Sequence, residues 1–212
     1  MGTAAEITCL FVDIGGVLLT DGWPHAARAL ASRKFDLHLD EWESRHHEAF
    51  ETYEMGKLSL DDYLTRVVFY TDRSFSSAQF KEFMFAQTQP FPNMIELVRK
   101  LKAKYGLKIV VVSNEAREIN AYRIRTFKLN EFVDVFISSC FVRLRKPDAD
   151  IFRLALDVVQ TPASQIVYIE NTPMFVQIAE SLGLQSILHT DYNTTRSKLA
   201  EFGLRSQDEI VQ

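Results

Sequence analysis

A strand pattern that ends in one carboxylate and two glycines constrains this chain more than any other feature. In the stretch CLFVDIGG, residues 9–16, positions 9–14 are apolar except for Asp13. A continuous apolar run is typical of a strand covered on both faces, as in a parallel sheet. Gly15 and Gly16 allow the backbone to turn sharply directly after the acid. The stretch therefore predicts a carboxylate at the carboxyl end of an interior strand.

Further apolar runs recur along the chain, and helical patterns lie between them. Together with the first, the strand-like runs are 7–13, 108–114, 133–139, 166–171 and, more weakly, 186–190. The helical patterns are 93–106, 147–160 and 173–183, and two of them close on a glycine. Alternation of strands and helices predicts an α/β fold with a Rossmann-like parallel sheet and helices on both faces.

The segment between the first strand and residue 90 has a different pattern. It contains no continuous apolar strand run, and four stretches at 24–35, 39–56, 59–70 and 76–87 have helical character. We therefore predict a core formed by residues 1–20 and 91–212, and a small helical cap formed by residues 21–90. The cap is rich in aromatic residues, and at helical spacing most of these are expected to pack in a bundle core while one or two line a substrate pocket.

Two short cap segments carry polar residues whose roles the sequence leaves open. Arg45, His46 and His47 are adjacent, so on a helix their side chains point in different directions. We interpret them as a solvated face, with a contact to substrate as the alternative. Thr20 and Asp21 lie in the loop expected to lead into the cap, where they would act as a hinge or gate.

Polar residues gather where the predicted strands end. In an open α/β sheet, ligands bind outside the carboxyl ends of the strands. The residues predicted at that edge are Asp13, Ser113, Asn114, Lys146, Glu170 and Asn171.

This set of side chains is suited to phosphoryl transfer. Asp13 can act as a nucleophile and as a metal ligand. Ser113 can donate a hydrogen bond to a phosphoryl oxygen, and Lys146 can neutralise the charge on a transferring phosphoryl group. Glu170 and the Asn171 amide oxygen are hard ligands suited to Mg²⁺. The residues therefore describe hydrolysis through an aspartyl-phosphate.

Four segments in this order give the chain a family resemblance. FVDIGGVL, VVVSN, RKPDADIF and IVYIENTPMFVQIAESLG resemble the motifs of the haloacid dehalogenase (HAD) superfamily, over residues from about 7 to 190. The first motif and the cap stretch FETYEMGKLSLDDYLTRV resemble the subgroup of glucose-1-phosphatase-type enzymes and epoxide-hydrolase N-terminal phosphatase domains. The resemblance implies a Rossmann-like core with a mobile cap.

The resemblance also implies roles for single residues. The family's nucleophile falls on Asp13, its phosphate-binding hydroxyl on Ser113 and its lysine on Lys146. The metal site falls on Asp13, Glu170 and Asn171, with the main-chain carbonyl of Gly15 as a further ligand. We expect Asn114 and Gly16 to contact the substrate.

The chain departs from the family pattern at two positions. Family phosphatases usually carry a second aspartate two residues after the nucleophile, which acts as general acid and base, and here that position is Gly15. The last motif usually has two acids, and its second position here is Asn171. The leading interpretation is a Mg²⁺-dependent phosphatase of a small phosphorylated metabolite. The alternatives are a metal-independent 2-haloacid dehalogenase and a catalytically weak or inactive HAD fold used for binding or regulation.

Composition and charge limit the classes of binding partner and the cellular compartment that we expect. A net charge of −4 offers no electrostatic attraction for nucleic acid or an anionic membrane. No apolar run approaches the ~20 residues of a membrane span. The N-terminus has no basic signal region, and the two cysteines have no metal-like spacing. These features predict a reduced cytoplasmic protein, and they do not indicate an oligomeric state.

Overall fold

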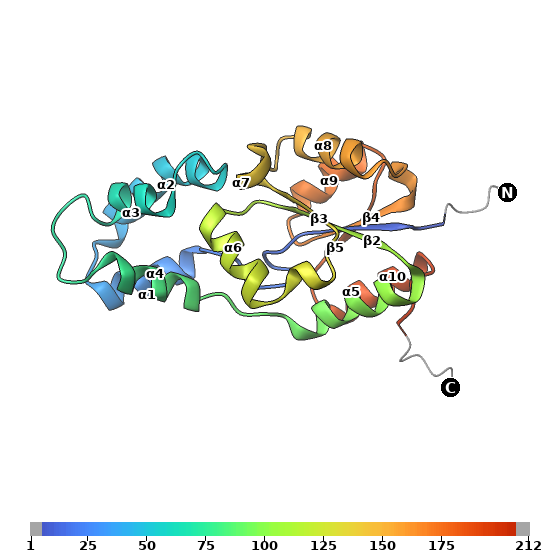
Figure 1. Ribbon diagram of the computed structural model, residues 1–212, viewed down its shortest axis with the longest axis horizontal. Coiled ribbons are helices and arrows are strands. Elements are labelled where there is room, and N and C mark those ends of the chain that lie inside the picture. The colour runs from blue at the N-terminus through green and yellow to red at the C-terminus, as the bar shows by residue number, and fades with distance from the viewer. Residues whose placement is uncertain (1–5, 207–212) are drawn as a thin grey trace.

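The computed structural model describes residues 6–206, so the ends of the predicted core, 1–5 and 207–212, lie outside the described residues. A five-stranded parallel sheet forms its centre, in the order β3-β2-β1-β4-β5 (Figure 1). The strands are β1 (Cys9–Val12), β2 (Lys108–Ser113), β3 (Val135–Ser138), β4 (Ile166–Glu170) and β5 (Gln185–Leu188). The predicted α/β fold with a parallel sheet is confirmed, and β1 lies in the middle of the sheet.

Helices cover both faces of the sheet because its strands alternate two apolar sets of side chains. Leu10 and Val12 of β1 pack in one core cluster, whereas Cys9 and Phe11 pack in another on the opposite face. The first cluster is covered by α5 (Pro92–Tyr105), α6 (Arg117–Thr126) and α10 (Tyr192–Glu201), and the second by α8 (Asp150–Val159) and α9 (Pro173–Ser181). A short helix α7 (Ser139–Val142) follows β3, and 3-10 turns occur at Leu129–Glu131 and Ala163–Gln165.

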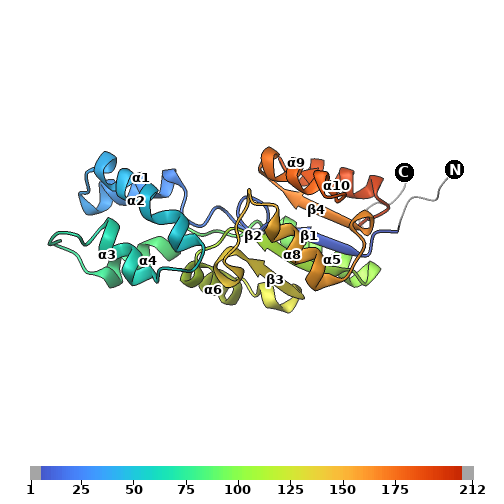
Figure 2. The same ribbon diagram turned by 90° about the horizontal axis from the view of Figure 1, so that it is seen from above.

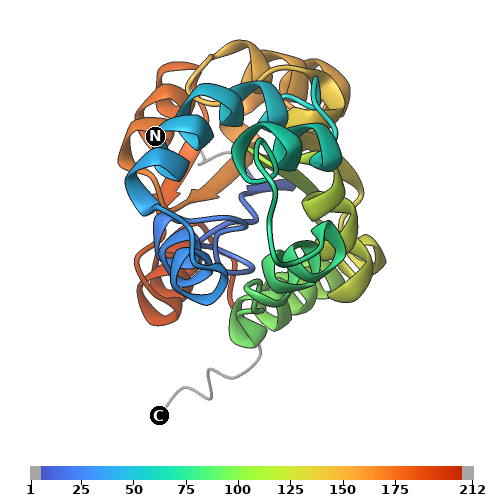
Figure 3. The same ribbon diagram turned by 90° about the vertical axis from the view of Figure 1, so that its left-hand side faces the viewer.

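Four helices form a separate layer at one end of the molecule (Figures 2 and 3). They are α1 (His25–Phe35), α2 (Leu39–Glu54), α3 (Leu60–Val67) and α4 (Ser77–Ala86). Ser59 and Ser76 begin α3 and α4 with capping boxes, in which the serine side chain accepts from the third helical residue. These helices have a core cluster of their own, centred on aromatic rings such as Trp42 and Phe80.

The cap helices contact the core through apolar packing at the start of α6, where Ala116 and Ile119 join the cap cluster, and through a small number of polar bonds. The Arg145 guanidinium pairs with Glu51 at 2.6 Å and with Glu54 at 2.8 Å, both on α2. The Ser139 hydroxyl donates to the Glu54 carbonyl at 2.7 Å, and the Leu60 amide donates to the Glu118 carboxylate at 2.9 Å. Because Arg145 directly precedes Lys146, the cap is seated next to a predicted active-site residue.

The interpretation of residues 45–47 as a solvated face is wrong for one of the three. His46 is buried, and its Nδ1 lies 2.6 Å from the Tyr63 hydroxyl. Its ring also lies 4.5 Å from that of Phe50. Arg45 instead covers the Tyr70 ring, and His47 is exposed. Helical spacing placed the histidines on different sides, but it did not show which side faced the cap core.

No helix within residues 6–206 has the length and apolar character needed to cross a bilayer. Cys9 and Cys140 are both free thiols and both buried.

Candidate active site

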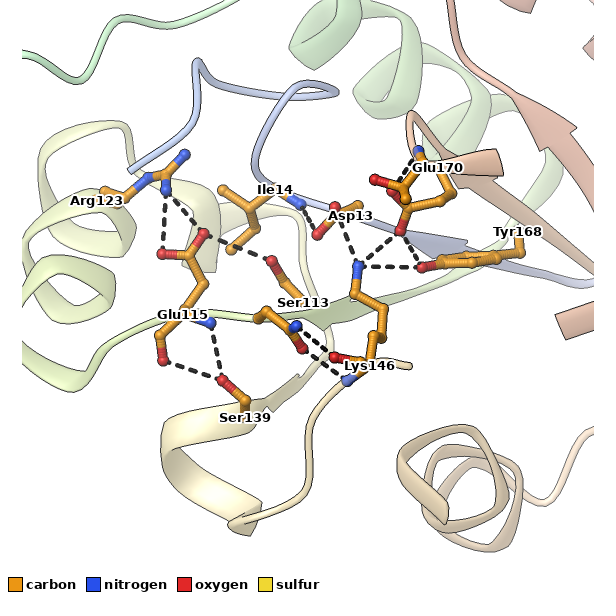
Figure 4. Close-up of polar contacts among 11 residues, drawn as sticks. Asp13, Ile14, Ser113, Glu115, Arg123, Ser139, Lys146, Tyr168 and Glu170 are labelled. Atoms are coloured by element: carbon orange, nitrogen blue, oxygen red, sulfur yellow. Dashed lines mark hydrogen bonds and ion pairs between the residues drawn. The ribbon is translucent and has the colours of Figure 1, made fainter. Parts of the chain in front are cut away.

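Asp13 lies at the carboxyl end of the central strand, between the ends of β2 and β4. Its amide donates to the Ile169 carbonyl at 3.0 Å, which extends the pairing of β1 and β4 by one residue. Its Oδ1 accepts the Ile14 amide at 2.8 Å (Figure 4). The side chain is only 9% exposed, so its orientation is set by the backbone that follows the strand.

Lys146 joins the two predicted acids. Its Nζ lies 3.0 Å from Oδ2 of Asp13 and 2.6 Å from Oε2 of Glu170, and it donates to the Tyr168 hydroxyl at 3.2 Å. The Tyr168 hydroxyl donates to the same Glu170 oxygen (Figure 4). The lysine is fully buried, so these partners replace the water that an ammonium group otherwise requires.

The main chain of Lys146 is held by Asn114. The Asn114 amide nitrogen donates to the Lys146 carbonyl, and the Lys146 amide donates to the Asn114 side-chain oxygen, both at 2.8 Å. Asn114 lines the cavity described below, but in this structure its amide positions the lysine.

Two buried carboxylates share one buried ammonium group. Burial raises the pKa of Asp13 to about 7, Lys146 opposes the rise, and Glu170 adds to it. Burial lowers the pKa of Lys146, but Asp13 and Glu170 outweigh it and the net pKa is raised. The cluster therefore keeps its lysine charged and has an excess of negative charge, which favours a further cation or a proton.

Ser113 ends β2 beside a second buried ion pair. Its hydroxyl lies 3.5 Å from the Glu115 carboxylate, which pairs with Arg123 at 2.8 Å. Arg123 also donates to the Thr20 carbonyl, so this pair ties the loop that enters the cap to the end of β2. Burial raises the pKa of Glu115, and the adjacent Arg123 opposes the rise.

Gly16 makes room for Asn171. Its φ is +73°, and a Cβ there would lie 2.1 Å from a terminal atom of the Asn171 amide. The Gly16 amide donates to the Leu19 carbonyl at 2.7 Å. In this structure Gly16 is thus a turn residue that brings Asn171 close, while its predicted contact with substrate stays a prediction.

The Asn171 amide lies close to two oxygens of the site, one from Glu170 and one from Gly15. One terminal atom of its amide lies 2.8 Å from Oε1 of Glu170 and 3.2 Å from the Gly15 carbonyl oxygen. Mg²⁺ binds oxygens at about 2.0–2.1 Å in an octahedron, which places adjacent ligands about 3 Å apart. If the amide oxygen faces this point, three oxygens converge; if the nitrogen does, it donates to the other two. The residues fit a divalent cation in the first orientation.

The candidate cation site would use amide and main-chain oxygens as ligands in addition to carboxylates. Within residues 6–206, no three His, Cys, Asp or Glu side chains are grouped to hold a metal ion. A cation here would be held by Glu170, by the amide oxygen of Asn171, by the main-chain oxygen of Gly15 and by Asp13.

A cavity of about 460 Å³ opens over these residues. Its floor includes Asp13, Ser113 and Lys146 from the core, and the cap contributes Phe50 and His46. The pKa of His46 is lowered to about 4, chiefly by burial, so the ring is neutral at pH 7. The cap also contributes the charged side chains of Asp21, Arg28 and Glu54, so charged groups from both the core and the cap line the cavity.

The sequence matches the haloacid dehalogenase-like hydrolase family over residues 7–183. The chain belongs to this family. Among curated relatives, the phosphorylated carbohydrates phosphatase of Thermotoga maritima is 28% identical over 93 residues, which is 44% of this chain and 41% of that protein. The chain spans less than half the length of the curated relatives that it matches.

Solved structures of this family share the fold. A HAD family enzyme from Bacteroides thetaiotaomicron, in complex with magnesium and inorganic phosphate, superposes with a TM-score of 0.71 at 17% identity over 86% of this chain and 93% of that one. The L-2-haloacid dehalogenase of Xanthobacter autotrophicus, with chloropropionic acid covalently bound, gives 0.60 at 16% identity over 97% and 91%. At these identities the likeness shows the fold alone.

The structure brings the predicted residues Asp13, Ser113, Lys146, Glu170 and Asn171 to one edge of the sheet. Sequence reasoning missed Tyr168 and the pair formed by Glu115 and Arg123. Tyr168 precedes Glu170 by two residues and therefore shares its side of β4. Glu115 directly follows the Ser113-Asn114 motif, so the sequence alone could have placed it near the site. No sequence feature indicates Arg123, because it lies on α6, a helix that the sequence patterns do not predict.

Proposed function

We propose that the chain is a Mg²⁺-dependent phosphatase of a small phosphorylated metabolite, with Asp13 as the nucleophile. The observation that carries the proposal is the ion pair of Asp13 and Lys146 at the floor of the cavity, 3.0 Å apart at the carboxyl end of the central strand. A nucleophilic carboxylate needs such a partner, which holds its orientation and lies beside the charge that develops during phosphoryl transfer.

Each floor residue has a defined task in this proposal. Asp13 attacks the phosphorus in line, and the bond to the leaving oxygen breaks. Lys146 and the Ser113 hydroxyl stabilise the phosphoryl oxygens, while Asn114 keeps the lysine main chain in place. Water then hydrolyses the aspartyl-phosphate. We also propose that residues 21–90 act as a cap that selects the rest of the substrate.

The proposed cation site consists of Asp13, Gly15, Glu170 and Asn171. When bound, Mg²⁺ would offset the negative charge of the phosphoryl group and of the Asp13 carboxylate. Support comes from the Glu170 carboxylate and Gly15 carbonyl oxygens, which face the same terminal atom of the Asn171 amide, and from the excess negative charge of the buried cluster. The named phosphatase relative and the family structure with magnesium and phosphate support the same chemistry.

A 2-haloacid dehalogenase is the second candidate. It is favoured by Gly15 and Asn171, because these residues leave fewer carboxylates than the family's phosphatases usually have. In that reaction Asp13 would attack carbon and displace halide, and no metal would be needed. Halide release in the presence of EDTA is the result that separates it from the first candidate.

The test of the proposed function is Asp13→Asn. The wild-type protein is expected to release phosphate from p-nitrophenyl phosphate in the presence of Mg²⁺, and the variant is expected to lose this activity while its circular dichroism spectrum stays the same. Asp157→Asn, an exposed change on α8, is the matched control. Activity that survives Asp13→Asn would refute the mechanism.

A further inference from the structure

A carboxylate lies where the side chain of residue 15 would be. Gly15 has no side chain, and a Cβ built on it would lie 3.1 Å from Oδ1 of Asp21. Asp21 lies in the loop that leads from the core to the cap, and both residues line the cavity above Asp13. The carboxylate of Asp21 therefore occupies the space that a side chain at position 15 would fill.

The other carboxylates that line the cavity are already paired. Asp13 pairs with Lys146, Glu54 with Arg145, and Glu115 with Arg123.

Asp21, in contrast, makes no hydrogen bond or ion pair with any other residue in the part of the chain that the structure describes. The imidazole in the cavity wall, His46, is neutral and bonded to Tyr63. Asp21 is thus the acid of this cavity that is free to exchange a proton with a substrate.

We propose that Asp21 is the general acid and base of this enzyme, in place of the side chain absent at Gly15. In the first step Asp13 bonds to phosphorus, the bond to the leaving oxygen breaks, and the Asp21 carboxyl gives its proton to that oxygen. In the second step water attacks phosphorus, its proton returns to the Asp21 carboxylate, and the bond to Asp13 breaks. The alcohol and phosphate leave, and Asp21 is protonated as at the start.

The inference rests on the proposed function, so its test compares two substrates. p-Nitrophenolate is a stable anion and needs no proton to leave, whereas the alkoxide of β-glycerophosphate does. Asp21→Ala is expected to slow phosphate release from β-glycerophosphate by about 10²-fold or more, the size of a general-acid effect, and to change p-nitrophenyl phosphate hydrolysis much less. Asp72→Ala, an exposed change in a cap loop, is the control.

A double variant tests whether the acid can be moved. Gly15 does not have a positive φ, so an aspartate fits its backbone once the Asp21 side chain is removed. The variant Gly15→Asp, Asp21→Ala is expected to regain much of the activity on β-glycerophosphate that Asp21→Ala loses.

Two results would overturn the inference while the proposed function stands. One is an Asp21→Ala variant that hydrolyses both substrates as fast as the wild type. The other is an equal loss on both substrates that the double variant does not reverse, because a structural role would produce that pattern. If the wild-type protein hydrolyses neither substrate, the proposed function fails, and the inference fails with it.

Discussion

The cap and the carboxyl edge of the sheet are both buried, but their interiors are chemically opposite. In the cap, rings such as Trp42 and Phe80 pack edge to face, with centroids 6.0 Å apart. At the sheet edge, Lys146 lies between two buried carboxylates. Burial of apolar rings stabilises the folded state directly, whereas burial of charges is tolerated only when each has a partner. The cap interior is thus held together by apolar packing, and the sheet edge by paired charges.

This difference predicts that substitutions in the two regions have different effects. Changes at the sheet edge are expected to stop turnover and to expose unpaired charges, whereas changes in the cap core are expected to alter stability and substrate fit. The largest expected effect is at Lys146. Lys146→Met leaves Asp13 and Glu170 buried without a cation, so turnover is expected to be lost and the free energy of unfolding to fall by about 3–5 kcal/mol.

Urea unfolding and phosphate release measure these two effects. Lys57→Met, an exposed lysine in the cap, is the control and is expected to change neither. A Lys146→Met protein that retains wild-type stability would contradict the interpretation that the lysine balances both acids.

In the cap, His46 provides a pH-dependent comparison. Its pKa is lowered from 6.5 to about 4, chiefly by burial, so the unfolded chain binds more protons than the folded one between these values. The free energy of unfolding therefore carries no penalty from His46 above pH 6.5, and it falls as the pH drops toward 4 because the unfolded chain takes up a proton that the folded chain does not. Between pH 7 and pH 5 the wild-type protein is expected to lose about 2 kcal/mol from this residue alone.

His46→Gln is expected to remove that part of the pH dependence, as measured by urea unfolding at both pH values. An equally steep loss in the variant would show that other groups cause it. His47→Gln, on the exposed neighbour, is the matched control.

The smallest predicted effect returns to the sheet edge, at Asn171. Asn171→Asp adds a carboxylate to the proposed cation site, so calorimetric titration is expected to show Mg²⁺ affinity about tenfold higher, equivalent to 1.4 kcal/mol. Without Mg²⁺ the variant is expected to melt at a lower temperature, because the new charge lies beside Glu170. Asn93→Asp, an exposed change on α5 outside the cavity, is the control. Unchanged Mg²⁺ affinity would show that residue 171 is not a ligand of the cation.

The sequence was more informative about the sheet edge than about the cap. Parallel strands bring their carboxyl ends together, so Asp13, Ser113 and Glu170 could be placed near one another from strand patterns alone. The continuous apolar runs were clear because these strands are covered on both faces. The alternation of strand and helix patterns along the chain likewise predicted the α/β fold.

Other features depend on tertiary contacts that spacing does not encode. The α6 sequence REINAYRIRT is mostly polar, so its apolar periodicity is weak, and the position of Arg123 was not predicted. The sequence indicates a hinge or gate role for Asp21 and not its proximity to Gly15, because that distance depends on the path of the loop. His46 was placed in solvent because a single helix does not show which face another helix covers.

The central claim is that Asp13 becomes phosphorylated and that water then attacks phosphorus. A single turnover of p-nitrophenyl phosphate in oxygen-18-labelled water, quenched in acid and analysed by mass spectrometry, tests it directly. We predict that the peptide containing Asp13 transiently carries a phosphoryl group and that the released phosphate carries oxygen-18. Phosphate release without a phosphorylated peptide, or oxygen-18 in the Asp13 carboxylate, would contradict the claim.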